Sequence, residues 1–340
     1  TSSMDDIAYW LPLVWAAIIA VAVAMYVILD GFDLGLGILF PSAPEERRRD
    51  VMMNSVAPFW DGNETWLILG GGGLFVAFPK AYGIIMSGLY IPIIVMLLAL
   101  VFRGVAFEFR WVAKPRHEFW DKAFAWGSIV ATFAQGIVLG GLLQGISVTN
   151  GQFSGGAFDW LSGFSIMCGL SLVAGYALLG STWLVMKTEG ELQLWARARA
   201  ELALVLTLGA IAIVSLWTAV GLPRIADVWF SWPNILLLAP IPLLTLYSGL
   251  KCWWGLIERK DVQPFLSAIA MFLLGFDGLV ISNVPFLVPD SVTVWQAAAA
   301  PSSQLFMLVG TLVMVPIILG YTAFVYWTFR GKVKEDAGYH

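Results

Sequence analysis

The chain has 340 residues, of which 59% are hydrophobic and 12% are charged. A soluble domain carries about 25% charged residues, so this composition excludes an ordinary water-soluble protein. The mean hydropathy of +0.81 and the repeated long apolar runs indicate an all-α integral membrane protein, because only helices and closed barrels satisfy the backbone in lipid. The net charge of −4 says less than the positions of the charges do.

The apolar runs predict about nine transmembrane helices within a single polytopic domain over residues 1–340. Pro240 and Pro242 are expected to kink the seventh helix. The polar stretch 146–157 lacks basic residues and is typical of a flexible turn. The expected spans are residues 9–40, 52–78, 81–109, 119–145, 158–187, 199–221, 233–257, 264–287 and 304–329.

Lysine and arginine positions predict the orientation of these helices, because cytoplasmic connections carry an excess of both. With the N-terminus outside, all but two of the 19 basic residues lie on the inner side, the exceptions being Lys80 and Arg224. We therefore expect the N-terminus outside and the C-terminus in the cytoplasm. The inner connections are then residues 41–51, 103–122, 187–199, 251–263 and the tail from 330.

Four carboxylates interrupt the most apolar part of the chain. Asp30 and Asp33 lie three residues apart in the first span, and Asp61 and Glu64 lie three residues apart in the second. A carboxylate in hydrocarbon costs several kcal/mol unless it is neutralised, paired or wetted, and leucine would make a better spanning helix. Arg103 reaches the same inner half from the third span and can pair with one of them. This pattern favours a path for protons or cations.

A purely structural use of these groups stays open at this point. The acids would then be polar packing points, and the arginine would only hold helices together. Gly35, Gly37 and the run Gly70–Gly73 are typical of helices that approach one another closely. Two acidic pairs in successive helices nevertheless favour a shared wet cavity.

Disulfide and metal chemistry have few candidate residues. Cys168 and Cys252 fall in apolar runs near opposite membrane faces, so we expect two buried thiols and no disulfide bond. His117 and His340 both lie in polar segments. A bis-histidine haem in the membrane core therefore finds no ligands here, and we expect no metal site.

Six motifs stand out along the chain. They are Leu29-Asp-Gly-Phe-Asp-Leu-Gly-Leu-Gly37, Asn54-Ser-Val-Ala-Pro-Phe-Trp-Asp-Gly-Asn-Glu-Thr-Trp66, Phe102-Arg-Gly-Val-Ala-Phe-Glu-Phe-Arg110, Trp295-Gln-Ala-Ala-Ala-Ala-Pro301, Tyr321-Thr-Ala-Phe-Val-Tyr-Trp327 and Phe329-Arg-Gly-Lys332. Together they resemble subunit II of the bacterial cytochrome bd-type quinol oxidases, and the resemblance covers nearly the whole chain. The sequence Gly62-Asn-Glu-Thr-Trp66 is more similar to the cyanide-insensitive branch.

The resemblance implies a fold and an activity. The family's enzyme is a complex in the bacterial cell (inner) membrane that oxidises quinol and reduces dioxygen to water, with protons taken from the cytoplasm. Its fold implies two four-helix bundles, made of helices 1–4 and 5–8, with a peripheral ninth helix at 304–329. This chain would scaffold the complex without being catalytic alone.

The resemblance also implies cofactors and partners. Two b-type haems and one d-type haem are expected in the partner, subunit I, and none in this chain. Some members hold a structural quinone, which no motif here tests, and the presence of small single-helix accessory subunits stays open. Trp66 matches a tryptophan near a proposed oxygen entry in some members.

Residue by residue, the resemblance assigns a proton route. Asp61 matches the acid that lines a proposed route towards the haems. Asp30, Asp33 and Arg103 match polar positions at the mouth or wall of that route. Glu64 stands where other members carry a neutral amide, so its part in proton transfer stays open.

The residues alone leave two other functions open. A secondary transporter would use the same acids for coupling ions, and would show interrupted helices at matching places in both halves of the chain. The first two spans are acid-rich and their counterparts are not, which argues against it. A membrane cytochrome would bind its own haem, against which the scarcity of histidine argues.

Overall fold

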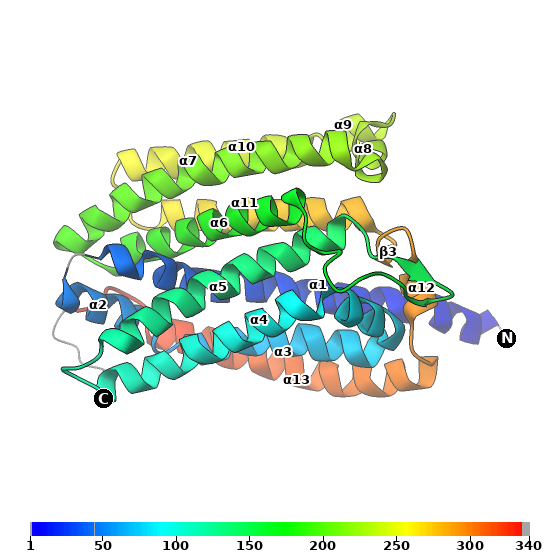
Figure 1. The fold of residues 1–340 in the computed structure, drawn as a ribbon, viewed down its shortest axis with the longest axis horizontal. Helices are drawn as coiled ribbons and strands as arrows, with labels where there is room; N and C mark the ends of the chain where they lie inside the picture. The colour runs from blue at the N-terminus through cyan, green and yellow to red at the C-terminus, as the bar shows by residue number, and fades with distance from the viewer. Residues whose placement is uncertain (1, 44, 335–340) are drawn as a thin grey trace.

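The computed structural model describes residues 2–43 and 45–334. The described chain is almost entirely helical, with two short β-hairpins (Figure 1), and confirms the all-α membrane class. The elements are α1 (Ser2–Leu39), a 3-10 turn (Phe40–Ser42), α2 (Glu46–Val56), α3 (Trp60–Ala77), α4 (Pro79–Val112), α5 (Glu118–Leu143), β1 (Val148–Thr149), β2 (Gln152–Phe153), α6 (Gly163–Lys187), α7 (Gly190–Gly221), α8 (Pro223–Phe230), α9 (Asn234–Leu238), α10 (Pro240–Ile257), α11 (Gln263–Asn283), β3 (Phe286–Val288), β4 (Val292–Thr293), α12 (Val294–Ala297) and α13 (Pro301–Thr328).

Eight helical segments of the described chain are long and apolar enough to cross a membrane. The expected span 52–78 is the exception and needs a correction, because the chain breaks at residues 57–59 into α2 and α3. Pro58 lies in the break, and a proline inside a helix removes a backbone hydrogen bond and clashes with the preceding turn. α3 still has 18 residues, about 27 Å at 1.5 Å per residue. Its polar first two turns lower its hydropathy.

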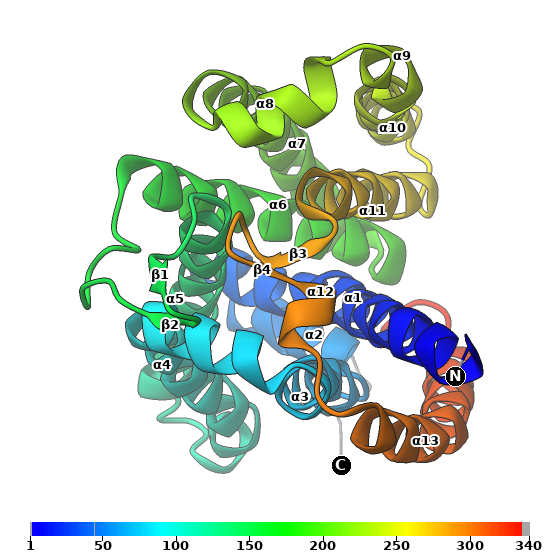
Figure 2. The same cartoon turned by 90° about the vertical axis from the view of Figure 1, so that its right-hand side faces the viewer.

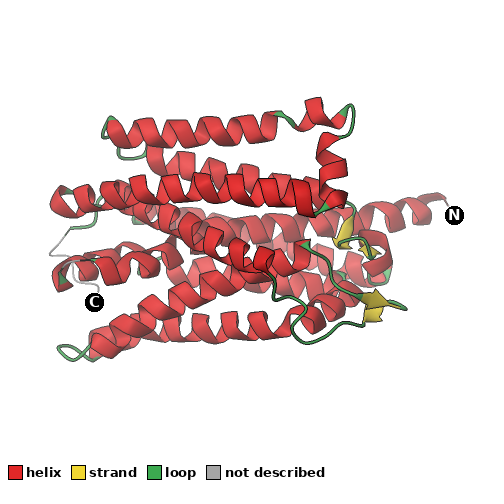
Figure 3. Ribbon diagram, turned by 45° about the horizontal axis from the view of Figure 1, so that its top comes forward, coloured by secondary structure: helices red, strands yellow, loops and turns green. Residues whose placement is uncertain are grey.

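The long helices lie side by side along the long axis of the molecule (Figures 1 and 3). α1 is central and packs against α3, α5 and α6, while α13 packs on α1 and α3 (Figure 2). On the other side, α6 and α11 separate α1 from an outer pair, α7 and α10 (Figure 2). The division into helices 1–4, helices 5–8 and a ninth helix stays a prediction.

Both hairpins lie at the end of the molecule where α1 begins (Figure 3). The predicted flexible turn at 146–157 contains the ordered hairpin β1–β2, in which Asn150 and Gly151 connect the strands. Both have positive φ, at 51° and 74°, and this backbone shape favours asparagine and glycine in two-residue hairpins. α9 ends at Leu238 and α10 begins at Pro240, so the helix is interrupted at Ala239, next to the prolines that were expected to kink it.

The five connections predicted to be cytoplasmic are joined to one another by ion pairs. Arg110 and Asp50 join the first two, with 2.6 Å between Nη1 and Oδ1. Arg197 and Lys332 both bind Asp261 at 2.7 Å and join the other three. These connections share one end of the molecule. That this end faces the cytoplasm stays a prediction.

Two glycines of α1 allow the close packing that the sequence predicted. A Cβ atom on Gly35 would lie 1.9 Å from the backbone oxygen of Tyr176 in α6. A Cβ atom on Gly37 would lie 1.9 Å from Oγ of Ser128 in α5. Because real Cβ atoms do not approach other atoms so closely, only glycine lets α1 sit this near both helices.

Candidate functional site

Arg103 of α4 lies at the centre of the predicted acidic region. Its side chain is fully buried, and its Nη2 donates to Asp30 of α1, at 2.9 Å from Oδ1 and 3.2 Å from Oδ2. The same nitrogen donates to Oε2 of Glu64 in α3 at 3.1 Å. One guanidinium therefore holds carboxylates from two other helices, where the sequence predicted a pair with one.

Asp33, three residues after Asp30 on α1, accepts a hydrogen bond from a side-chain amide of α3. Nδ2 of Asn63 donates to Oδ2 of Asp33 at 2.8 Å and to the carbonyl oxygen of Leu29 at 3.3 Å. The hydroxyl of Tyr326, in α13, donates to Oδ1 of the same amide at 2.7 Å. Asp30, Asp33, Asn63, Glu64 and Arg103 together form the Arg103 cluster.

The spacing of residues on α1 explains why its polar groups face the cluster. Tyr26, Asp30 and Asp33 recur at intervals of four and three residues and so share one face of the helix. Both aspartates are fully buried.

The break before α3 places its acids at the start of a helix. α3 begins at Trp60, so that Asp61 lies in its first turn, where the helix dipole stabilises negative charge. The ring of Trp60 lies 5.8 Å from the guanidinium carbon of Arg103 and stacks on Phe107 at 4.8 Å. An unbroken helix from 52 to 78 would lack this favourable terminus beside the acids.

A groove between α3 and α4 adjoins the cluster and has a volume of about 310 Å³. Its polar lining includes Asp61 and Glu64, and its apolar lining includes Trp60, Ile68 and Val101. Asp61 is exposed, and the side chain of Glu64 is 28% exposed. Glu64 thus contacts both the groove and the buried arginine.

The predicted site residues therefore differ in whether they contact Arg103. Asp30, Glu64 and Arg103 meet directly, while Asp33, three residues after Asp30 on α1, accepts a hydrogen bond from the amide of Asn63 in α3. Asp61 lines the groove and forms no ion pair among the described residues.

Trp66 lies apart from the groove. It is 2% exposed and packs against Ala22 and Tyr26 between α1 and α3. Its indole nitrogen has no hydrogen-bond partner in the described chain. The part of Trp66 in oxygen entry stays a prediction.

Sequence reasoning missed a polar chain beside the cluster. Nε2 of Gln135 donates to the hydroxyl of Tyr26 at 2.8 Å, and the hydroxyl of Tyr176 donates to Oε1 of Gln135 at 2.9 Å. The sequence could have pointed to Tyr26, because this residue lies one helical turn before Asp30. It could not have pointed to Gln135 or Tyr176, because α5 and α6 come close to Asp30 only through tertiary packing.

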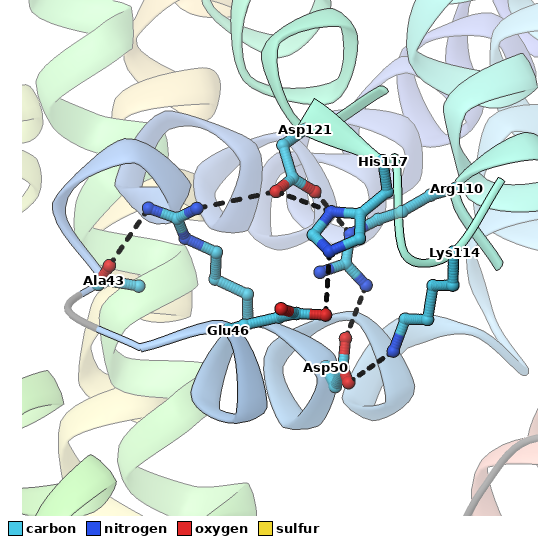
Figure 4. Close-up of polar contacts among 8 residues, drawn as sticks. Ala43, Glu46, Asp50, Arg110, Lys114, His117 and Asp121 are labelled. Carbon is cyan, nitrogen blue, oxygen red and sulfur yellow. Dashed lines mark hydrogen bonds and ion pairs between the residues drawn. The ribbon is translucent and has the colours of Figure 1, made fainter. Parts of the chain in front are cut away.

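A second group of charges surrounds another arginine of α4 (Figure 4). Arg110 is fully buried, and its Nε donates to Oδ1 of Asp121 at 2.5 Å. Its Nη1 donates to Oδ1 of Asp50 at 2.6 Å, and Nζ of Lys114 donates to the other oxygen of Asp50 at 2.6 Å. Three helices, α2, α4 and α5, are thereby tied together.

His117 bridges Asp121 and one further carboxylate, that of Glu46 (Figure 4). Its Nδ1 lies 3.0 Å from Oδ2 of Asp121, and its Nε2 lies 2.7 Å from Oε1 of Glu46. Nη1 of Arg49 approaches the same oxygen of Asp121 at 3.5 Å. These charged residues form the Arg110 network, which consists of Glu46, Arg49, Asp50, Arg110, Lys114, His117 and Asp121.

Two carboxyls of the ion-paired end keep their charge. Burial by itself would raise the pKa of Asp50, but hydrogen bonds from Lys114 and Arg110 outweigh it and lower that pKa. The pKa of Asp261 is likewise lowered, because Lys332 and Arg197 outweigh the effect of burial. Groups that stay ionised at neutral pH serve as anchors and are poor proton carriers.

The described residues contain no group of three or more His, Cys, Asp and Glu side chains arranged for a metal ion. Cys168 and Cys252 are buried and have free thiols. His117 has both ring nitrogens engaged by carboxylates, and His340 lies outside the described residues.

Known proteins resemble this chain over almost its full length. The family model described as cytochrome bd terminal oxidase subunit II matches residues 11–329. Subunit 2 of the cytochrome bd-I ubiquinol oxidase of Escherichia coli is 32% identical over 382 aligned positions, covering 96% of each chain. Subunit 2 of the cytochrome bd ubiquinol oxidase of Bacillus subtilis is 29% identical, covering 94% of this chain and 96% of the relative.

The fold agrees with these relatives. A chain of the bd oxidase structure from Geobacillus thermodenitrificans superimposes with a TM-score of 0.79 at 17% identity, covering 94% of this chain and 98% of the other. At that identity the likeness concerns the fold alone. Together with the family match and the membrane helices, it shows that this chain belongs to the cytochrome bd terminal oxidase subunit II family and is a multi-pass protein of the bacterial inner membrane.

Proposed function

We propose that this chain carries no haem, supports the haem-bearing subunit I of a terminal quinol oxidase and provides a route for protons from the cytoplasm. One observation carries the route: Glu64 lines the groove between α3 and α4 and also contacts the buried Arg103. The complex would couple the oxidation of quinol to the reduction of dioxygen to water, and forming water consumes protons.

The route would begin at Asp61 and continue through Glu64 towards Asp33. Asp61 is exposed in the groove, so it can exchange protons with water there. Oδ1 of Asp33 and both Nε and Nη1 of Arg103 are buried without a hydrogen-bond partner among the described residues. Donors and acceptors of this kind can bind bridging water, and protons move along chains of acids and water.

Asp30 would have a different part. Its two oxygens face one nitrogen of Arg103 at 2.9 and 3.2 Å, and both side chains are fully buried. Because an arginine side chain keeps its proton, a directly paired carboxylate serves best as a fixed counter-charge. Asp30 would therefore form the wall of the route, while Glu64 and Asp33 carry protons.

The location of the haems follows from the side chains available. A b-type or d-type haem needs axial ligands, most often histidine. Within the described residues only His117 is a histidine, and Asp121 and Glu46 occupy both its ring nitrogens. These residues do not fit a haem, which supports its placement in subunit I.

The surface for subunit I would be the face that bears the groove. Ile68, in the groove wall, is 72% exposed. α13 lies beside α3, and none of its most apolar window is buried within the chain (Figure 2). Protons that enter at the groove must reach haems outside this chain, so covering this face would both stabilise the complex and shorten the transfer.

The route is tested by Asp61→Asn. Quinol oxidase turnover should fall about tenfold, equivalent to about 1.4 kcal/mol in the barrier, because the amide cannot relay a proton. Assembly and haem content should stay normal. Asp277→Asn is the matched control, an exposed acid of α11 outside the groove. Unchanged turnover in the Asp61 variant would remove this residue from the route.

The supporting surface is tested by photo-crosslinking in the intact membrane. The crosslinker p-benzoylphenylalanine replaces Ile68 in one variant and Leu216 of α7 in another. These positions are similarly exposed, at 72% and 68%. Position 68 should crosslink to subunit I and position 216 to lipid. A crosslink to subunit I from 216 alone would place the supporting surface on the opposite side of the chain.

A further inference from the structure

A second groove runs between α10 and α11, on the side of the molecule away from the Arg103 cluster. Its volume is about 710 Å³. From Gln263 to Leu274 it follows twelve residues of α11, about 16 Å for eleven steps of 1.5 Å. Ser248, Ser267 and Ala270 line it. Side chains this small leave a channel where larger ones would fill the space between the helices.

Polarity changes along this groove. Lys251 and Gln263 line one end, close to the connection between the two helices. Leu244, Leu273 and Leu274 line the other end, deeper along both helices. The groove is therefore polar near the helix ends and apolar towards their middle. Polarity changes with depth in the same way across one half of a bilayer.

No described residue neutralises the ammonium group of Lys251. It lies six residues before the end of α10, about 9 Å along the helix, and its one contact among the described side chains is the ring of Tyr247, at 6.0 Å. The neighbouring acids are engaged elsewhere. Glu258 binds Lys260, and Asp261 binds Arg197 and Lys332.

Two hydroxyls in the groove also lack partners. Ser248 and Ser267 are 8% and 6% exposed. Neither side chain forms a hydrogen bond within the described chain, whereas Thr245, one turn away, donates to the carbonyl oxygen of Ile241. Hydroxyl groups in apolar surroundings normally donate to some acceptor. The groove thus offers a cation and two hydroxyl donors above an apolar channel.

We propose that this groove binds one anionic glycerophospholipid. The phosphate would lie against Lys251, and the hydroxyls of Ser248 and Ser267 would donate to the ester oxygens. One acyl chain would follow the apolar part past Ala270. Charge complementarity selects a lipid over a transmembrane helix of another protein, because a helix would leave the ammonium group unpaired.

The test is titration of the purified, delipidated oxidase complex with phosphatidylglycerol, followed by native mass spectrometry. Phosphatidylcholine, which has no net charge, is the reference lipid. The complex should bind one phosphatidylglycerol more tightly than any phosphatidylcholine. Lys251→Gln should weaken this step about fivefold, as expected for losing one cation beside an anionic lipid.

Two variants make the result specific. Arg199→Gln is the matched control, since Arg199 also contacts only an aromatic ring, that of Trp195, among the described residues, but lines no groove. It should leave binding unchanged. Ala270→Phe, which fills the channel, should abolish the tight step while retaining the cation.

Several results would overturn the proposal. These are equal binding of the two lipids, equal losses from Lys251→Gln and Arg199→Gln, or binding unaffected by Ala270→Phe. Extraction of a quinone or a small membrane protein as the groove's occupant would overturn it as well. Haem content, measured for each variant, confirms that the complex has assembled.

Discussion

Arg103 and Arg110 lie on the same helix, seven residues apart, and both are fully buried, yet they are used differently. Arg110 pairs through two nitrogens with two carboxylates that themselves accept from other cations, and its Nη2 alone has no partner among the described residues. Arg103 places two carboxylates on a single nitrogen and leaves Nε and Nη1 without partners in the described chain. Nearly full pairing marks an anchor, and incomplete pairing leaves donors that can bind water.

The surroundings of the two groups agree with this contrast. The Arg110 network ties together connections at one end of the molecule, where Asp50 keeps its charge through a lowered pKa. The Arg103 cluster lies among spanning helices and touches a groove through Glu64. A buried ion pair is weak evidence for stability by itself, so the unpaired atoms and the groove decide the interpretation.

Among the substitutions that test this contrast, Arg103→Leu should have the largest effect, a loss of thermal stability. It leaves Asp30 as an unpaired buried carboxylate, which typically costs about 3–5 kcal/mol. Thermal unfolding of the purified oxidase measures the loss. The double variant Arg103→Leu with Asp30→Asn should recover a large part, because no charge is then stranded. Normal assembly and thermal stability of the single variant would refute the pairing.

Two neutral replacements should separate transfer from anchoring. Glu64→Gln should slow turnover about tenfold and leave thermal stability nearly unchanged, because the side chain is partly exposed and an amide still accepts from Arg103. Asp121→Asn should do the reverse, with a loss of about 1–3 kcal/mol and near-normal turnover. If both variants lost the same property, the division between cluster and network would fail.

The smallest effect is the pH dependence contributed by Asp50. Its pKa is lowered in the folded chain, so the folded state binds fewer protons and the stabilisation is complete above the ordinary value of 3.8. It is lost as the pH falls through the folded value. The difference in melting temperature between wild type and Asp50→Asn should therefore shrink as the pH falls from 6 to below 4. A constant difference would show that the pairs with Lys114 and Arg110 do not depend on ionisation.

The sequence alone predicted the membrane class and, within the described chain, eight of the nine expected spans. Apolar runs are long and continuous, so they determine helices locally. The four acids and Arg103 stood out because charge is costly in lipid. The sequence predicted that Arg103 pairs with one of these acids, and the structure shows it beside two, Asp30 and Glu64. The part of these residues in proton transfer stays a prediction.

Only the tertiary structure decided which acid touches which partner. The break at residues 57–59, the amide bridge from Asn63 to Asp33, and the link from Tyr326 all depend on how α1, α3 and α13 pack. Each of the two grooves is likewise formed by a pair of helices, so neither helix alone reveals it in the sequence. Hydropathy and helical periodicity are local properties of a sequence, whereas pairing and open space arise where distant segments meet.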